Sequence, residues 1–193
     1  MKIIDNRFNE NLIKSFVGKK LTKIKHDHFR YTNTVTGVVG FMIDNKSYAM
    51  VNDYEEVDYL DWDDEACICR ITERPWDEIR SFVEGEEQIT TEINEIVEQV
   101  TIINDHIESY SYGNKDYDVW ETRAIIFDLG SYQVSFTKQV CFFSMEIEVN
   151  KGYDLIEKIE TTDAFYSEHN NSEEQTLKIS REIVKFPYNE NAV

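Results

Sequence analysis

Hydrophobic and polar residues alternate along several short stretches of this chain, and turn residues separate these stretches. Residues 37–51 form two apolar runs around the turn residues Asp44-Asn45-Lys46, and residues 123–136 form two runs around Gly130. The runs are rich in β-branched and aromatic residues, which favour strands, and their short turns favour antiparallel pairing. The pattern therefore predicts one β-hairpin in each half of the chain.

Other stretches carry apolar residues at helical spacing and predict amphipathic helices near 12–17 and 89–100. The apolar positions of these two helices are Leu12, Ile13, Phe16, Val17, Ile89, Ile93, Ile96, Val97 and Val100. Two shorter helices are predicted at 76–82 and 153–159, where an aromatic residue and an aspartate precede apolar residues at helical spacing. Pro75 suits the first turn of a helix, and Gly85 suits the end of one.

The two halves share this order of elements and a few identities. Asp27-His28 and Asp105-His106 lie 78 residues apart, and Ser47-Tyr48 and Ser131-Tyr132 lie 84 apart. We therefore predict an α+β fold of two related units, each an antiparallel β-sheet with flanking helices, produced by internal duplication. The units span 1–86 (a first α/β-hairpin unit) and 87–160 (a second, related unit), and 161–193 is a C-terminal extension with an added strand near 175–186 and a frayed tail. The alternative, a coincidence of two ordinary hairpins, stays open.

The composition is that of a globular protein, with 41% hydrophobic and 13% aromatic residues, 7 Gly and 2 Pro. The sequence contains no run of about 18 apolar residues that could span a membrane, and residues 1–17 lack the apolar segment of a secretion signal. Cys67 and Cys69 project to one face if they lie on a strand, and a disulfide between near neighbours is strained. We expect reduced thiols packed in the interior and a cytoplasmic location. Abundant Ile, Asn, Lys and Tyr with little Ala suggest a low-GC bacterium or its phage.

The net charge of −18 is unevenly distributed along the chain. Residues 1–52 carry nine basic and four acidic residues, whereas residues 53–98 carry seventeen acidic residues and three arginines. The densest segment is 53–65, with eight acidic residues in thirteen positions. Averaged over the surface, one net charge per roughly 530 Å² is too dilute to imitate DNA, so a nucleic-acid mimic would need a clustered acidic face.

Segment 53–65 is the natural candidate for such a face, because its acidic residues are interleaved with aromatic ones that commonly bind at interfaces. The predicted partner-binding residues are Asp53, Glu55, Glu56, Asp58, Tyr59, Asp61, Trp62, Asp63, Asp64 and Glu65. The alternative is a solvated edge or loop whose aromatic residues turn inward to the core.

Candidate catalytic and metal-binding residues are few. His26 and His28 would share one face of a strand, with His106 in the matching place of the second unit, but no compact ligand motif accompanies them. Acidic pairs such as Asp63 with Glu65 or Asp116 with Asp118 arise by chance in so acidic a chain, and the sequence contains no phosphate-binding loop or nucleophile elbow. We therefore expect no catalytic residue, metal or cofactor.

These observations favour a non-enzymatic acidic binding protein that blocks or titrates a cationic, nucleic-acid-handling partner such as a nuclease. In composition it is similar to phage or mobile-element inhibitors of bacterial defence and to immunity proteins that neutralise nuclease toxins. Its charge argues against direct binding of nucleic acid, and nothing indicates a membrane partner. Lys14, Lys19, Lys20, Lys23 and Lys25 are expected to pair with the acidic middle of the chain, within a monomer or across a homodimer. The alternatives are a carboxylate- or metal-dependent hydrolase and a housekeeping homodimeric interaction module.

Overall fold

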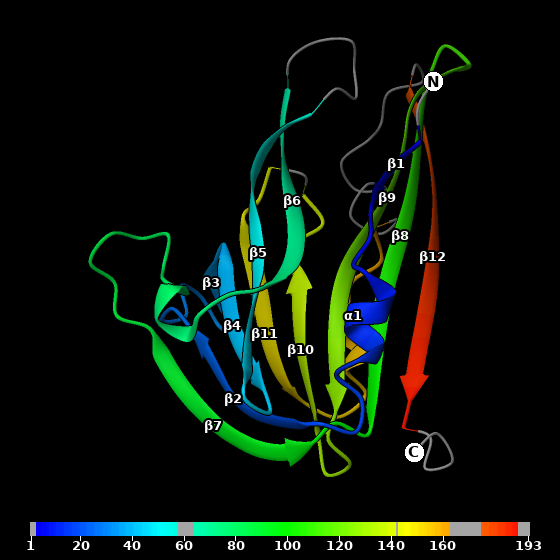
Figure 1. Ribbon diagram of the computed structural model, residues 1–193. Helices are drawn as coiled ribbons and strands as arrows, with labels where there is room; N and C mark the ends of the chain where they lie inside the picture. Colours follow the sequence, from blue (N-terminus) through cyan, green and yellow to red (C-terminus); the bar gives the residue numbers. More distant parts are fainter. Residues whose placement is uncertain (1–2, 58–63, 142, 163–174, 189–193) are drawn as a thin grey trace.

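The computed structural model describes residues 3–57, 64–141, 143–162 and 175–188, and these residues form two antiparallel β-sheets that face each other (Figure 1). The five-stranded sheet has the order β6-β5-β4-β2-β7. Its strands are β2 (Lys20–His26), β4 (Val38–Ile43), β5 (Lys46–Val57), β6 (Asp64–Glu73) and β7 (Ile89–Ile96).

The seven-stranded sheet has the order β12-β8-β9-β10-β11-β3, and β1 pairs in parallel with β9. Its strands are β1 (Ile4–Asn6), β3 (Thr34–Thr36), β8 (Gln99–Ser111), β9 (Asn114–Asp128), β10 (Gln133–Lys138), β11 (Glu146–Gly152) and β12 (Gln175–Pro187). The described helical elements are short: α1 (Glu10–Lys14), α2 (Leu155–Lys158) and a 3-10 turn, η1 (Trp76–Glu78). The fold is therefore mostly β.

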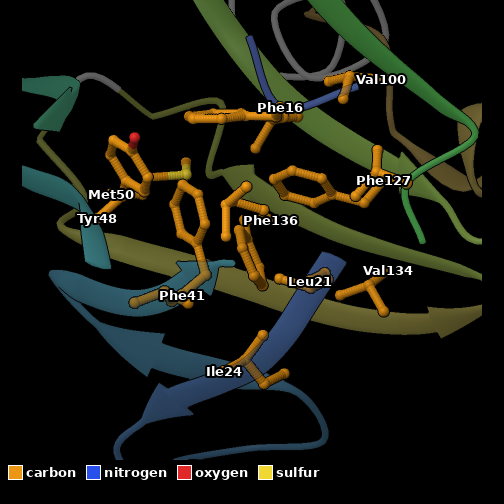
Figure 2. Close-up of a cluster of buried hydrophobic side chains, with 14 of the residues drawn as sticks. Phe16, Leu21, Ile24, Phe41, Tyr48, Met50, Val100, Phe127, Val134 and Phe136 are labelled. Atoms are coloured by element: carbon orange, nitrogen blue, oxygen red, sulfur yellow. The ribbon is translucent and has the colours of Figure 1, made fainter. Parts of the chain in front are cut away.

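The main hydrophobic core lies between the two sheets and is rich in aromatic rings (Figure 2). Phe41 from β4 meets Phe127 from β9 and Phe136 from β10 at ring-centroid distances of 5.4 and 5.8 Å. Phe16, which follows α1, packs on Tyr48 of β5 at 4.9 Å in an edge-to-face arrangement. Tilted and edge-to-face pairs are favoured by the charge distribution of aromatic rings, so these contacts hold the sheets together beyond simple burial.

The chain passes directly from one sheet to the other at Gly37, between β3 and β4. Its φ of 71° lies in the left-handed region, and a Cβ atom at this position would lie 2.3 Å from the ring of Phe82. Glycine alone adopts this positive φ readily and has no Cβ atom to meet Phe82, so only glycine fits here without rearrangement. This crossing joins β3, at the end of the seven-stranded sheet, to β4, the central strand of the five-stranded sheet.

The predicted helix at 89–100 is wrong, because these residues form β7 and the first part of β8. The apolar spacing matched a helix, but Ile89 and Ile96 are exposed and only Ile93 of β7 is buried. β7 pairs with β2 along its length, and its β-branched Ile and Thr residues suit that pairing. The predicted helices at 76–82 and 153–159 shrink to η1 and α2, whereas the helix expected near 12–17 is present as α1 at 10–14.

A duplication is not shown by this fold. A four-stranded meander does occur in each sheet, β6-β5-β4-β2 in one and β8-β9-β10-β11 in the other. However, sequential strands commonly lie side by side in any antiparallel protein, so this likeness of order does not demonstrate a common origin. Strands of the two predicted units also pair with each other, β7 with β2 and β3 with β11. The strand expected near 175–186 is present as β12, which pairs with β8 throughout.

Candidate functional site

The described residues of the acidic segment, 53–57 on β5 and 64–65 on β6, lie on paired strands of one hairpin (Figure 1). Glu56 lies directly opposite Glu65, and Val57 lies opposite Asp64. Of the predicted partner-binding residues, Asp53, Glu55 and Glu56 lie on β5, and Asp64 and Glu65 lie on β6. The others, Asp58, Tyr59, Asp61, Trp62 and Asp63, lie outside the described residues.

The two faces of this hairpin carry different side chains, because successive residues of a strand point to opposite sides. Tyr54, Glu56 and Glu65 share the face of the buried residues Asn52 and Cys69, which is turned toward the other sheet. Asp53, Glu55 and Arg70 share the opposite face. Acidic side chains therefore extend from both faces of the hairpin.

Hydrogen bonds attach the inner face of the hairpin to the loop between β10 and β11. The Tyr54 hydroxyl donates to the Phe143 carbonyl at 2.7 Å, and the Asn52 side-chain nitrogen donates to the Ser144 carbonyl at 2.9 Å. Both aromatic rings remain accessible, since Tyr54 is 45% and Phe143 is 58% exposed. The hairpin thus presents carboxylates beside two exposed aromatic side chains.

Glu55 of this region forms an ion pair within its own hairpin. Glu55 accepts two hydrogen bonds from the Arg70 guanidinium, at 2.9 and 2.7 Å, and this pair lowers the pKa of Glu55. Asp53, Glu56 and Glu65 are exposed, and segment 53–65 itself contains no basic residue. Like charges directly opposite each other on paired strands are unfavourable, so the Glu56–Glu65 pair works against the hairpin that holds it.

Cys67 and Cys69 pack inside the sandwich, which confirms the interpretation of these thiols as interior strand residues. Burial raises the pKa of Cys67 to about 11 and that of Cys69 to about 12. Because the thiolate is the nucleophilic form, neither residue is suited to nucleophilic catalysis at neutral pH.

The three histidines that the structure describes do not form a common site. His26 is buried, its ring stacks on Phe29 at 4.8 Å, and its Nδ1 lies 2.7 Å from the Asp27 carbonyl oxygen. His28 is exposed and lies beyond the end of β2, so the prediction that it shares a strand face with His26 is wrong. His106 lies on β8 in the other sheet.

A cluster that sequence reasoning missed surrounds His106 near the end of the β8–β9 hairpin. Ligand-type atoms of His106, Glu108 and Asp118 lie within 4.8 Å of one another. The His106 Nε2 is 2.8 Å from Asp118 Oδ1, and the Lys115 ammonium donates to Asp118 Oδ2 at 2.7 Å and also to Glu108. The lysine lowers the pKa of both carboxyl groups and stands where a metal cation would have to bind. Lys115 is thus an internal cation for both carboxylates of this group of ligand-type side chains.

Asp105 is the centre of a second group of charges that the sequence did not reveal. Arg181 of β12 donates to both of its carboxylate oxygens, at 2.7 and 2.8 Å, and the Thr162 hydroxyl also donates to it. Arg123 of β9 lies 3.5 Å away, and all of Asp105 is buried. Asp27 is buried in a similar manner and accepts from Ser81 at 2.8 Å and Gln88 at 3.2 Å. Both aspartates of the matched Asp-His pairs are therefore buried and hydrogen-bonded.

Two of the five amino-terminal lysines, Lys23 and Lys25, contact Trp76. Lys23 and Lys25 each place their ammonium group 4.6 Å from the Trp76 ring, and Lys25 also donates to the Trp76 carbonyl at 2.5 Å. Lys14 pairs with Glu10 one helical turn away. The contacts described for Lys14, Lys23 and Lys25 do not involve the hairpin carboxylates.

Comparison of the chain with protein families, with curated proteins and with solved structures finds no match. Among the described residues, no helix has the length and apolar character needed to cross a membrane.

Proposed function

We propose that this protein is a non-enzymatic acidic binding protein whose β5–β6 hairpin binds a cationic surface of a nucleic-acid-handling partner. The observation that supports this proposal is the hairpin pairing itself, which places exposed carboxylates of both strands together at one end of the sandwich. Proteins that handle nucleic acids carry basic surfaces for the phosphate backbone, so they are the class of partner that such an end would attract.

The unfavourable Glu56–Glu65 pairing supports a role in binding. Two carboxylates directly opposite each other repel, and a cation from a partner would relieve that repulsion on binding. Tyr54 and Phe143 add exposed rings beside them, and aromatic side chains contribute strongly to interfaces and accept arginine over their faces. The combination favours a partner that presents arginine.

The test compares two triple variants of equal charge. In the first, Asp53→Asn, Glu56→Gln and Glu65→Gln neutralise the hairpin; in the second, Glu87→Gln, Glu92→Gln and Glu95→Gln neutralise three exposed acidic residues outside it. Association with an immobilised nona-arginine peptide and with a panel of basic nucleases is measured at low and high salt. The Debye length falls from about 10 Å at 0.1 M to about 3 Å at 1 M, so electrostatic association should slow as salt rises.

The hairpin variant should associate about tenfold more slowly at low salt and lose most of its salt dependence, because surface charges act mainly on the association rate. The second variant should stay close to wild type. If both variants associate equally slowly, only the net charge of the protein matters. If the hairpin variant associates as wild type does, the hairpin is not the binding surface.

One observation favours a homodimeric interaction module as the second candidate. β12 pairs with β8 along its length, and no other described strand pairs with β12. An open strand edge of this length is a template for pairing with another chain. Sedimentation analysis over a range of concentrations distinguishes a dimer from a monomer, and a monomer at all concentrations would exclude this candidate.

A further inference from the structure

A cavity of about 450 Å³ opens between the two sheets, where β2 and β7 of one sheet face β10 and β11 of the other. Its floor is apolar and consists of Ile24, Ile93, Val134 and Val149. These four side chains belong to the main core, and Figure 2 shows Ile24 and Val134 at the border of that cluster. The cavity is therefore a place where the hydrophobic core itself faces an opening.

Aromatic and polar groups form the walls and the rim of this cavity. The His26 ring lies flat against Phe29, with centroids 4.8 Å apart and an interplanar angle of 11°. On the opposite side, the Asn33 side-chain nitrogen donates to the Asn150 side-chain oxygen at 2.8 Å, which joins the loop before β3 to β11. Lys151 is exposed at the rim, with its ammonium group 4.0 Å from the Tyr132 ring.

The charge of the lining is the opposite of the charge of the chain. The sequence contains 38 acidic and 20 basic residues. Among the described residues that line this cavity there is no aspartate or glutamate, and Lys151 supplies the one formal charge. An apolar floor with a single cation at its edge matches a ligand that is apolar at one end and anionic at the other.

We infer that this cavity binds a small amphipathic carboxylate, with its hydrocarbon part on the floor formed by Ile24, Ile93, Val134 and Val149 and its carboxylate beside Lys151. The volume lies within the range of about 300–1,000 Å³ that is usual for small-molecule sites. The inference is separate from the proposed function, because the cavity and the acidic hairpin involve different residues.

The experiment uses the full chain and two probes of equal chain length, octanoate and octanol. Binding is followed by calorimetry and by the amide and methyl NMR signals of the lining residues. Octanoate should shift the signals of Ile24, Val134 and Val149, and each further methylene in a series from hexanoate to decanoate should tighten binding about fourfold. Octanol should occupy the same floor with weaker affinity, since it lacks the charge.

Two variants and one control test the residues. Lys151→Gln should weaken octanoate at least tenfold, since a charge-assisted contact is lost, and should leave octanol within about twofold. Thr91→Trp places a large side chain at the exposed β7 wall of the opening without altering the floor, and it should abolish binding of both probes. Lys178→Gln, an exposed lysine on β12, has the same charge change and should bind both probes as wild type does.

If a large excess of octanoate leaves the NMR signals of the lining residues unchanged, the proposed site is wrong. Equal binding of octanoate and octanol, unaffected by Lys151→Gln, would overturn the carboxylate class. The hairpin variant with Asp53→Asn, Glu56→Gln and Glu65→Gln should bind octanoate normally, so failure of the cavity inference and failure of the proposed function remain distinguishable.

Discussion

The charges around Asp105 and those at the end of the β5–β6 hairpin belong to one acidic chain but are arranged in opposite ways. Asp105 is fully buried, and it receives hydrogen bonds from Arg181 and Thr162 with Arg123 close by. In the hairpin, Asp53, Glu56 and Glu65 are exposed, and two of them face each other across the strands.

This difference separates structural charges from charges available to a partner. A buried carboxylate is tolerated only when nearby cations and hydrogen-bond donors compensate its charge. Asp105 and its partners therefore serve to stabilise the fold. An exposed carboxylate is hydrated and contributes little to stability, so the exposed Asp53 and Glu56 are not needed to hold the fold together. Four measurements test this distinction between buried and exposed charges.

The largest effect is expected for Asp105→Asn. The change leaves Arg181 and Arg123 without their buried carboxylate, and breaking a buried ion pair in this way costs about 3–5 kcal/mol. Chemical denaturation should show that loss in the free energy of unfolding. The same chemical change at Asp53 should alter stability by no more than about 0.5 kcal/mol. Equal losses of unfolding free energy at Asp105 and Asp53 would contradict the distinction between buried and exposed charges.

Cysteine reactivity should differ strongly between the interior and the surface. With a pKa of about 11, Cys67 is only about one-thousandth thiolate at pH 8, and Cys69 is still less ionised. A thiol reagent should therefore label the partly exposed Cys141 first and the other two only after unfolding. Mass spectrometry of partially labelled protein identifies the sites. Rapid labelling of Cys67 in the native state would mean that the inner face of the hairpin opens.

The ion cluster at His106 should give a smaller effect that depends on pH. Lys115 lowers the pKa of Asp118 below 3.8 and that of Glu108 below 4.5. A lowered pKa in the folded state adds stability above the unfolded pKa, and this contribution disappears as the pH falls through the folded value. Lys115→Gln should thus lower the melting temperature at pH 6, and the difference from wild type should shrink below about pH 3.8. A difference that stays constant down to pH 2 would contradict the assignment.

The smallest effect on stability is expected for Arg70→Gln. This change removes the partner of Glu55, but both side chains are more than 40% exposed, and exposed pairs contribute about 0–1 kcal/mol. The pKa of Glu55 should rise toward its ordinary value, which NMR titration can follow. Because the hairpin becomes more acidic, association with nona-arginine should become faster. A slower rate would indicate that Arg70 orients the hairpin for binding.

Local sequence patterns predicted the elements whose partners lie nearby in the chain. The β4–β5 hairpin turns at Asp44, whose φ is 52°, and the β9–β10 connection includes Gly130, whose φ is 77°. Both turns have the residue types that their backbone conformations require. The burial of Cys67 and Cys69 also followed from their apolar neighbours on a strand.

Elements that depend on distant partners were missed. β7 has a helical apolar spacing, and only its pairing with β2, more than sixty residues earlier, makes it a strand. Likewise, Asp105 and Arg181 are separated by 76 residues, so nothing near Asp105 in the sequence announces that its charge is buried. The residues that line the cavity beside Lys151 come from four strands and the loop between β2 and β3, and no local sequence pattern contains such information.

The order of strands along the chain has a consequence for synthesis. Every strand of the five-stranded sheet lies within residues 20–96, whereas β8, β9 and β10, which cover its apolar face, end only at residue 138. At about 5–20 residues per second, translation takes roughly 2–8 seconds to cross that interval. During this time the nascent chain exposes the inward side of β4 and β5, including Phe41 and Met50. The emerging chain therefore carries an uncovered apolar sheet face until the second sheet is synthesised, which makes it prone to aggregation during that interval.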